Sequence, residues 1–361
     1  MRAPLHHRRA LATFGRAGVS YERIRYPRAD ALGDVAALCL TPSASPVGRV
    51  VVAHGAGNDA LFPLLDIFRA LVGGGFEVFA FDLDGHGWES TTCFSADAVR
   101  TAIPAALEQA RAGRPPLPIF LLGHSLGGAL VLSALGASVD GVEAAVVLSA
   151  PVSVEFSLRS SAAELWRFFR RETWTQRAGY GLWGVVPAVG LLKRRAYPLR
   201  LAAEAAGSFG YVRTIQNLLA DLDIARAARR IRIPVLLVYG GHDALVPPAQ
   251  GDTLADAIPR AELVRLPHAS HYGVPVARET PRIVAGWLAA RVAELSDAED
   301  VDRPASPGSV ATDEASPRHT SPEPMDGVLP RRLAVESVSP EAGSCERVAV
   351  DAGRVETMGA R

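Results

Sequence analysis

The chain has 361 residues, of which 48% are apolar and 21% charged, proportions close to those of average globular proteins. Its 38 basic and 38 acidic residues give a formal net charge of zero, which argues against nucleic acid as a partner of the whole chain. The three cysteines, Cys39, Cys93 and Cys345, are odd in number and widely spaced, so they predict neither a disulfide framework nor a metal site. We therefore expect a cytoplasmic protein.

The two ends of the chain differ from its middle. Residues 1–18 are basic but lack the apolar stretch of a signal peptide, and we expect a flexible N-terminal arm. Residues 297–361 contain no Phe, Trp or Tyr and are rich in Pro, Ser, Glu and Asp, which predicts a disordered tail. The tail has 7 arginines against 13 acidic residues, a net charge of −6, so residues 1–296 carry +6.

Between the ends, short apolar runs alternate with helical patterns. The predicted strands are Val19–Arg28, Asp34–Leu40, Val50–Ala53, Phe76–Asp82, Ile119–Gly123, Ala144–Ser149, Val235–Tyr239 and Glu262–Leu266. The predicted helices are Phe62–Leu71, Ala96–Ala112, Gly127–Gly136, Pro248–Ala257 and Thr280–Ala293. Runs that are apolar on both faces are typical of a parallel sheet covered by helices. The pattern predicts an α/β fold with a mostly parallel, doubly wound sheet of about eight strands.

One connection, of about 80 residues, is far longer than a normal crossover between strands. Its pattern is helical and aromatic, which predicts a helical cap inserted over residues 152–230 between core segments 19–151 and 231–296. Within it, the apolar stretch Tyr180–Leu192 precedes the basic run Lys193–Arg195. This pair allows a weak contact of the cap with a membrane surface, the alternative being a buried helix with a solvated end.

A serine motif lies between a predicted strand and a predicted helix. The sequence Gly123-His124-Ser125-Leu126-Gly127 has the form G-x-S-x-G, which in a strand–turn–helix context exposes the serine oxygen. The helix N-terminus behind the serine supplies N–H groups and a partial positive charge for a developing oxyanion. The motif therefore predicts that Ser125 is a nucleophile rather than a structural turn residue.

A serine nucleophile needs a base that an acid orients. Asp243 and His271 each lie in a loop after a predicted strand, and the carboxyl ends of parallel strands share one edge of a sheet. We favour them over the alternatives, which are Asp221 and Asp223 for the acid and His268 for the base. Three other histidines are expected to pack in loops: His86, His124 and His242.

A glycine-rich turn, His54-Gly55-Ala56-Gly57-Asn58, follows the predicted strand Val50–Ala53. Such a turn can present a backbone N–H to an oxyanion, and we assign this role to the N–H groups of Ala56 and Leu126. A phosphate-binding loop is the alternative, but no Gly-Lys-Ser/Thr follows.

These motifs resemble the α/β-hydrolase superfamily over residues of about 20–295. The segments that carry the resemblance are His54–Gly57, Asp82–Gly87, Gly123–Gly128, Gly241–Asp243 and His271. The combination of HGAG and GHSLGG is similar to the monoacylglycerol lipase and lysophospholipase-like branch, whose domain is of the serine aminopeptidase type. The resemblance implies a Ser125–His271–Asp243 triad, oxyanion amides at Ala56 and Leu126, and a mobile helical cap.

The sequence therefore predicts a serine hydrolase that cleaves carboxylic esters, with a lipid-like or otherwise medium to long acyl group, through an acyl-enzyme. We expect no cofactor and no metal, a small-molecule ester as the binding partner, and we infer no partner protein. The alternatives on the same triad are a thioesterase, a lactonase or an acyltransferase. A non-catalytic, ligand-binding protein on the same fold is the remaining alternative.

Overall fold

The computed structural model describes residues 5–28, 31–87, 89–153, 164, 166, 199–205, 207–302 and 346–347. Most of the predicted cap and of the predicted tail lies outside these ranges. So do Tyr180–Leu192 and Lys193–Arg195, and the membrane-surface contact stays a prediction. Among the helices of the described ranges, none combines the length and apolar character needed to cross a membrane.

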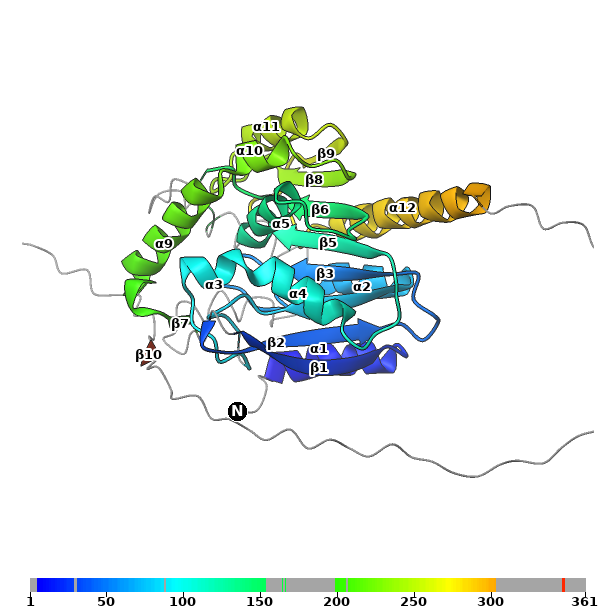
Figure 1. Ribbon diagram of the computed structural model, residues 1–361, viewed down its shortest axis with the longest axis horizontal. Coiled ribbons are helices and arrows are strands. Elements are labelled where there is room, and N and C mark those ends of the chain that lie inside the picture. Colours follow the sequence, from blue (N-terminus) through cyan, green and yellow to red (C-terminus); the bar gives the residue numbers. More distant parts are fainter. Residues whose placement is uncertain are drawn as a thin grey trace, which may run out of the picture.

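An eight-stranded sheet lies at the centre of the molecule (Figure 1), in the order β1-β2-β4-β3-β5-β6-β8-β9. Its strands are β1 (Ser20–Arg28), β2 (Gly33–Thr41), β3 (Gly48–Ala53), β4 (Phe76–Phe81), β5 (Ile119–His124), β6 (Ala144–Leu148), β8 (Val235–Gly240) and β9 (Ala261–Leu266). The strand β2 pairs antiparallel with β1 and β4, and the other pairs are parallel. The predicted fold class and its strands are confirmed.

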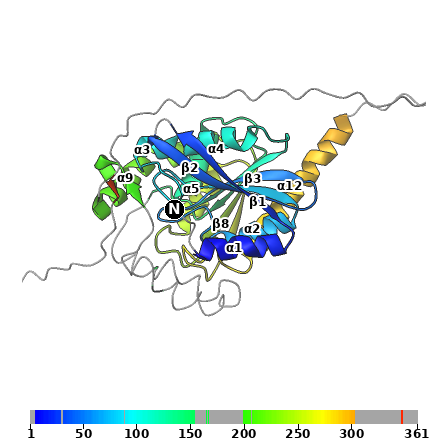
Figure 2. The same ribbon diagram turned by 90° about the horizontal axis from the view of Figure 1, so that it is seen from below.

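Helices cover both faces of the sheet, because the strands turn alternate apolar side chains to opposite sides. Val51 and Ala53 belong to one buried cluster, whereas Val50 and Val52 belong to the other. The second cluster is covered by α1 (Leu5–Arg16), α2 (Leu65–Gly73) and α12 (Thr280–Asp302). The first is covered by α3 (Ala96–Arg100), α4 (Ala102–Arg111), α5 (Leu126–Gly136), α10 (Ile224–Ala228) and α11 (Ala249–Ala257). Figure 2 shows α1 and α2 on the opposite side of the sheet from α3 and α4.

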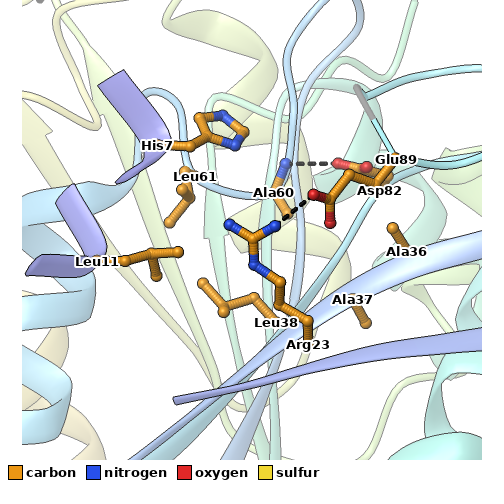
Figure 3. Close-up of a pocket in the computed structure, with 10 residues that line it drawn as sticks. All are labelled: His7, Leu11, Arg23, Ala36, Ala37, Leu38, Ala60, Leu61, Asp82 and Glu89. Carbon is orange, nitrogen blue, oxygen red and sulfur yellow. Dashed lines mark hydrogen bonds and ion pairs between the residues drawn. The ribbon is translucent and has the colours of Figure 1, made fainter. Parts of the chain in front are cut away.

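The N-terminal segment is a docked helix, and the prediction of a flexible arm over 1–18 was wrong for Leu5–Arg16. Leu11 and Phe14, three residues apart and therefore on one face, are 3% and 2% exposed. Burial of these two apolar side chains against the sheet stabilises the docked helix. The basic composition of the segment gave no indication of this contact. A cavity of about 40 Å³ remains beneath the helix, and Figure 3 shows its lining residues, among them His7, Arg23 and Asp82.

Two further features of the chain differ from expectation. Cys39 is free and buried, whereas Cys93 is disulfide-bonded, a bond that the spacing of the cysteines did not predict. Cys345 lies outside the described residues. The last helix, α12, continues past the predicted core boundary at 296 to Asp302.

The described part of the insertion is helical towards its end. It comprises β7 (Arg200–Leu201), a 3-10 turn (Ala203–Ala205), α9 (Gly207–Leu222) and α10, together with Glu164 and Trp166. The short strand β10 (Glu346–Arg347) pairs antiparallel with β7. Figure 1 shows α9 beyond the carboxyl ends of the parallel strands, which is the edge at which the predicted site lies.

Candidate functional site

Ser125 lies on a sharp turn between β5 and α5. Its backbone has φ +53° and ψ −119°, an unusual conformation for a residue with a side chain. A Cβ on Gly123 would come within 2.6 Å of the Gly128 nitrogen, and one on Gly127 within 2.3 Å of the Ala53 oxygen. Only glycine fits at these two positions, and the close packing holds the Ser125 side chain at the carboxyl edge of the sheet.

Ser125, His271 and Asp243 form a continuous chain of hydrogen bonds. The Ser125 hydroxyl donates to Nε2 of His271 at 2.9 Å, and Nδ1 of His271 donates to Oδ2 of Asp243 at 2.8 Å. The other oxygen of Asp243 accepts from the N–H groups of Leu245 and Val246 at 2.9 and 2.7 Å. Because its second oxygen is fixed by the turn after β8, the carboxylate can hold the imidazole in one orientation.

The charge of Asp243 controls the imidazole. Burial by itself lowers the pKa of His271, but the charge of Asp243, its hydrogen bond and the charge of Glu164 all raise it, and the net direction is upward. Asp243 and His271 are 6% and 3% exposed, so water screens this pair weakly. The arrangement favours an imidazole that accepts a proton readily from the serine hydroxyl.

The other candidates for the acid and the base lie elsewhere. His268 and His242 are both exposed, and their rings pack on each other with centroids 5.8 Å apart. Asp221 is exposed and forms an ion pair with Arg100 at 3.5 Å. Asp223 caps α10, where its side chain accepts from the Arg226 N–H at 3.2 Å. Each of these residues therefore has a partner other than Ser125 or His271.

The glycine-rich loop after β3 lies against Ser125, since a Cβ on Gly55 would come within 3.1 Å of the Ser125 Cβ. His54 fixes this loop. Its Nε2 accepts from the Leu83 N–H at 2.9 Å, so Nδ1 carries the proton and donates to the Gly55 carbonyl at 2.7 Å. In a trans peptide the N–H points opposite to the carbonyl. The Ala56 N–H therefore points away from the His54 ring.

Tyr211 on α9 holds the next peptide of the same loop. Its hydroxyl accepts from the Gly57 N–H at 3.0 Å and pairs with Nε2 of His86 at 2.8 Å. Nδ1 of His86 lies 3.0 Å from the Asp84 carbonyl and must donate to it, so Nε2 accepts the Tyr211 proton. Burial lowers the pKa of His86 to about 3 and that of His54 to about 4, which keeps both rings neutral.

The motif Asp82–Gly87 packs against the glycine-rich loop after β3. Asp82 accepts from the Ala60 N–H at 2.9 Å and from the Ser90 hydroxyl at 3.1 Å, and Asp84 pairs with Arg28 at 3.1 Å. The motif thus serves as a scaffold, and His86 packs in it as expected. His124 is also buried, with its ring centroid 5.3 Å from that of His271.

Sequence reasoning missed two residues at the site, Tyr211 and Glu164. Glu164 is fully buried, at 0% exposure, and accepts backbone N–H groups from the loops that carry Asp243 and His271. Both residues belong to the insertion and have no motif around them. No signal in the sequence distinguished Glu164, because Glu155 and Glu172 lie on either side of it in the same stretch.

The chain is similar to known α/β hydrolases in sequence. The sequence profile described as "Alpha/beta hydrolase family" matches residues 50–287. The chain is 28% identical over 218 residues to a pimeloyl-[acyl-carrier protein] methyl ester esterase of Chromobacterium violaceum, covering 54% of this chain and 77% of that protein. It is 25% identical over 287 residues to a monoglyceride lipase of Rattus norvegicus, covering 70% of this chain and 86% of that protein.

The fold also matches solved structures. An esterase of Pyrococcus furiosus superposes with a TM-score of 0.53 at 15% identity, over 78% of this chain and 93% of that one. At this identity the likeness concerns the fold alone.

Proposed function

Since the chain belongs to the α/β hydrolase family, we propose that it cleaves carboxylic esters with Ser125 as nucleophile, His271 as base and Asp243 as the orienting acid. The chain is a hydrolase of the esterase and lipase type. The observation that carries the proposal is the hydrogen-bonded chain from the Ser125 hydroxyl through His271 to Asp243, on the turn after β5.

The proposed reaction proceeds in two steps through an acyl-enzyme. Nε2 of His271 takes the Ser125 proton while the serine oxygen attacks the ester carbonyl, and the imidazolium then protonates the leaving alcohol. Water next attacks the acyl group by the same route, which releases the acid and restores the serine. The role of Asp243 is to orient the ring and to stabilise the imidazolium.

The oxyanion of the tetrahedral intermediate needs two N–H donors, and we propose those of Leu126 and Ala56. Leu126 directly follows the nucleophile and begins α5, where backbone N–H groups lack partners within the helix. The orientation of the Gly55–Ala56 peptide, fixed by His54 and by the Asn58 N–H that also reaches the Gly55 carbonyl at 3.2 Å, supports Ala56. Loss of one such donor typically costs about 3–4 kcal/mol of transition-state stabilisation.

For the substrate, we propose a medium or long acyl ester. The support is the aromatic and apolar composition of the insertion, since such surfaces suit acyl chains. Rates for p-nitrophenyl esters from acetate to dodecanoate test this choice. We expect kcat/KM to rise to octanoate or beyond, and a maximum at acetate would contradict it.

The cytoplasmic location remains a prediction from sequence.

A fluorophosphonate probe tests the proposed nucleophile. We expect one label per chain, on the tryptic peptide that contains Ser125, and no label on the Ser125→Ala variant. Labelling of another serine, or equal labelling of both proteins, would contradict the proposal. The exposed Ser296→Ala variant is the matched control and should label like the wild type.

A further inference from the structure

One carboxylate of the insertion bridges the acid loop and the base loop. The two oxygens of Glu164 accept from the N–H groups of Ala244 and Tyr272, each at 3.2 Å. Ala244 directly follows Asp243, and Tyr272 directly follows His271. A single side chain therefore connects the two loops whose separation sets the hydrogen bond between His271 and Asp243.

Glu164 is a buried carboxylate, and burial of such a group costs free energy unless hydrogen bonds replace its lost hydration. Its side chain has an exposed fraction of 0%. A buried carboxylate must recover its lost hydration through hydrogen bonds, and here backbone donors from two separate loops supply them. The same contact also brings its negative charge close to the imidazole, where it acts to raise the pKa of His271.

We propose that Glu164 is a positioning residue that clamps the loops of Asp243 and His271 together and supplies a second negative charge beside the imidazolium formed during ester cleavage. This inference rests on the proposed function and deepens it. It gives the insertion a direct part in the proton-transfer machinery, in addition to any role in covering the substrate.

Among the described residues, few titratable groups surround His271. The His124 ring lies 5.3 Å away, and burial holds its pKa well below the usual value, so it is neutral. The Tyr272 ring lies 5.5 Å away and is also neutral, because burial, followed by the charges of Glu164 and Asp243, raises its pKa to about 12. The two carboxylates, Asp243 and Glu164, thus dominate the field at His271.

The sign of the effect follows from this arrangement. A negative charge stabilises the imidazolium over the neutral ring, which raises the pKa of His271. Removal of the charge lowers that pKa, and the acid limb of the kcat/KM profile must then move to lower pH. Removal of the charge also stabilises the transition state less, so the plateau at high pH, where His271 is neutral in both proteins, must fall.

The experiment compares pH profiles of p-nitrophenyl butyrate hydrolysis. Glu164→Gln keeps the size of the side chain but removes its charge and one acceptor oxygen. We expect its acid limb to move by roughly 0.5–1 pH unit to lower pH and its plateau kcat to fall about tenfold, with little change in KM. Glu164→Asp keeps the charge with a shorter reach, and should lower kcat without moving the limb.

The control is Glu77→Gln, another buried carboxylate, which pairs with Arg49 far from the site and is 5% exposed. Its limb should coincide with that of the wild type. A Glu164→Gln profile that also coincides overturns the proposal, as does failure of both Glu164→Gln and Glu164→Asp to fold by circular dichroism, since Glu164 would then serve the fold. A wild type without Ser125-dependent turnover overturns the proposed function instead.

Discussion

Two groups of residues meet at the carboxyl edge of the sheet, and they come from different parts of the chain. Ser125, Asp243 and His271 stand on turns that follow strands, and their side chains bind one another. Tyr211 and Glu164 come from the insertion, and they bind backbone N–H groups of the loops. In the proposed mechanism the sheet therefore supplies the reacting groups, whereas the insertion supplies their supports.

The difference has a physical basis. A turn that directly follows a buried strand is held in place by the backbone hydrogen bonds of that strand, so the backbone of a residue in the turn has a fixed position. The loops themselves are irregular, and their backbone groups need partners from another element. Mutations in the first group should nearly abolish kcat, and mutations in the second group should lower kcat by a smaller factor.

The largest effect is expected in the first group. Ser125→Ala and His271→Ala should each lower kcat for an ester substrate by about 10⁶-fold, and the double variant should lose no more, because the residues act as a unit. Steady-state rates with p-nitrophenyl butyrate measure this. Multiplicative losses in the double variant would show that the two side chains act independently.

The acid comes next. Asp243→Asn should lower kcat by about 10⁴-fold, since an amide nitrogen facing Nδ1 favours the wrong tautomer of His271. Asp223→Asn, at the alternative acid from the sequence, should retain wild-type kcat. Near-full turnover of Asp243→Asn would assign the acid to another residue.

A support on the oxyanion side should have a smaller effect. Tyr211→Phe leaves the Gly57 N–H without its partner, and we expect kcat to fall about tenfold with KM nearly unchanged. Tyr239→Phe is the control, because the Tyr239 hydroxyl donates to the Ala150 carbonyl at 2.6 Å within the core. It should lower thermal stability, with kcat unaffected. Equal kcat values for Tyr211→Phe and wild type would remove Tyr211 from the supports.

The smallest effect on activity is expected far from both groups. Phe14→Ala on α1 creates a cavity beside the sheet and should lower the free energy of unfolding by about 3–5 kcal/mol. At 15 °C its kcat should match the wild type. The exposed Leu32→Ala variant, at 74% exposure, should change neither quantity. A wild-type melting temperature for Phe14→Ala would show that α1 does not dock in solution.

The sequence predicted the sheet, and it brought the three candidate site residues to one sheet edge, because both inferences depend on local patterns. Apolar runs such as Val235–Tyr239 identify buried strands without knowledge of their neighbours. The glycines around Ser125 predict a tight turn. Asp243 and His271 each follow a predicted parallel strand, which places them at the same sheet edge.

The supports and the N-terminal helix depend on tertiary contacts that no local pattern encodes. Tyr211 and Gly57 are distant in sequence, and nothing near Tyr211 distinguishes it from the other aromatic residues of the insertion. Phe14 and Leu11 have helical spacing, but basic neighbours obscured it. The disulfide at Cys93 likewise could not be deduced from cysteine spacing.

The central claim, covalent catalysis by Ser125, is tested most directly by rapid mixing with p-nitrophenyl octanoate, an acidic quench, and mass spectrometry of the intact protein and of its peptides. The account predicts a burst of one p-nitrophenol per chain and a transient octanoyl adduct on the Ser125 peptide, both absent from Ser125→Ala. Slow deacylation under acidic quench should preserve the adduct. Turnover by Ser125→Ala at the wild-type rate, or an adduct on another residue, would contradict it.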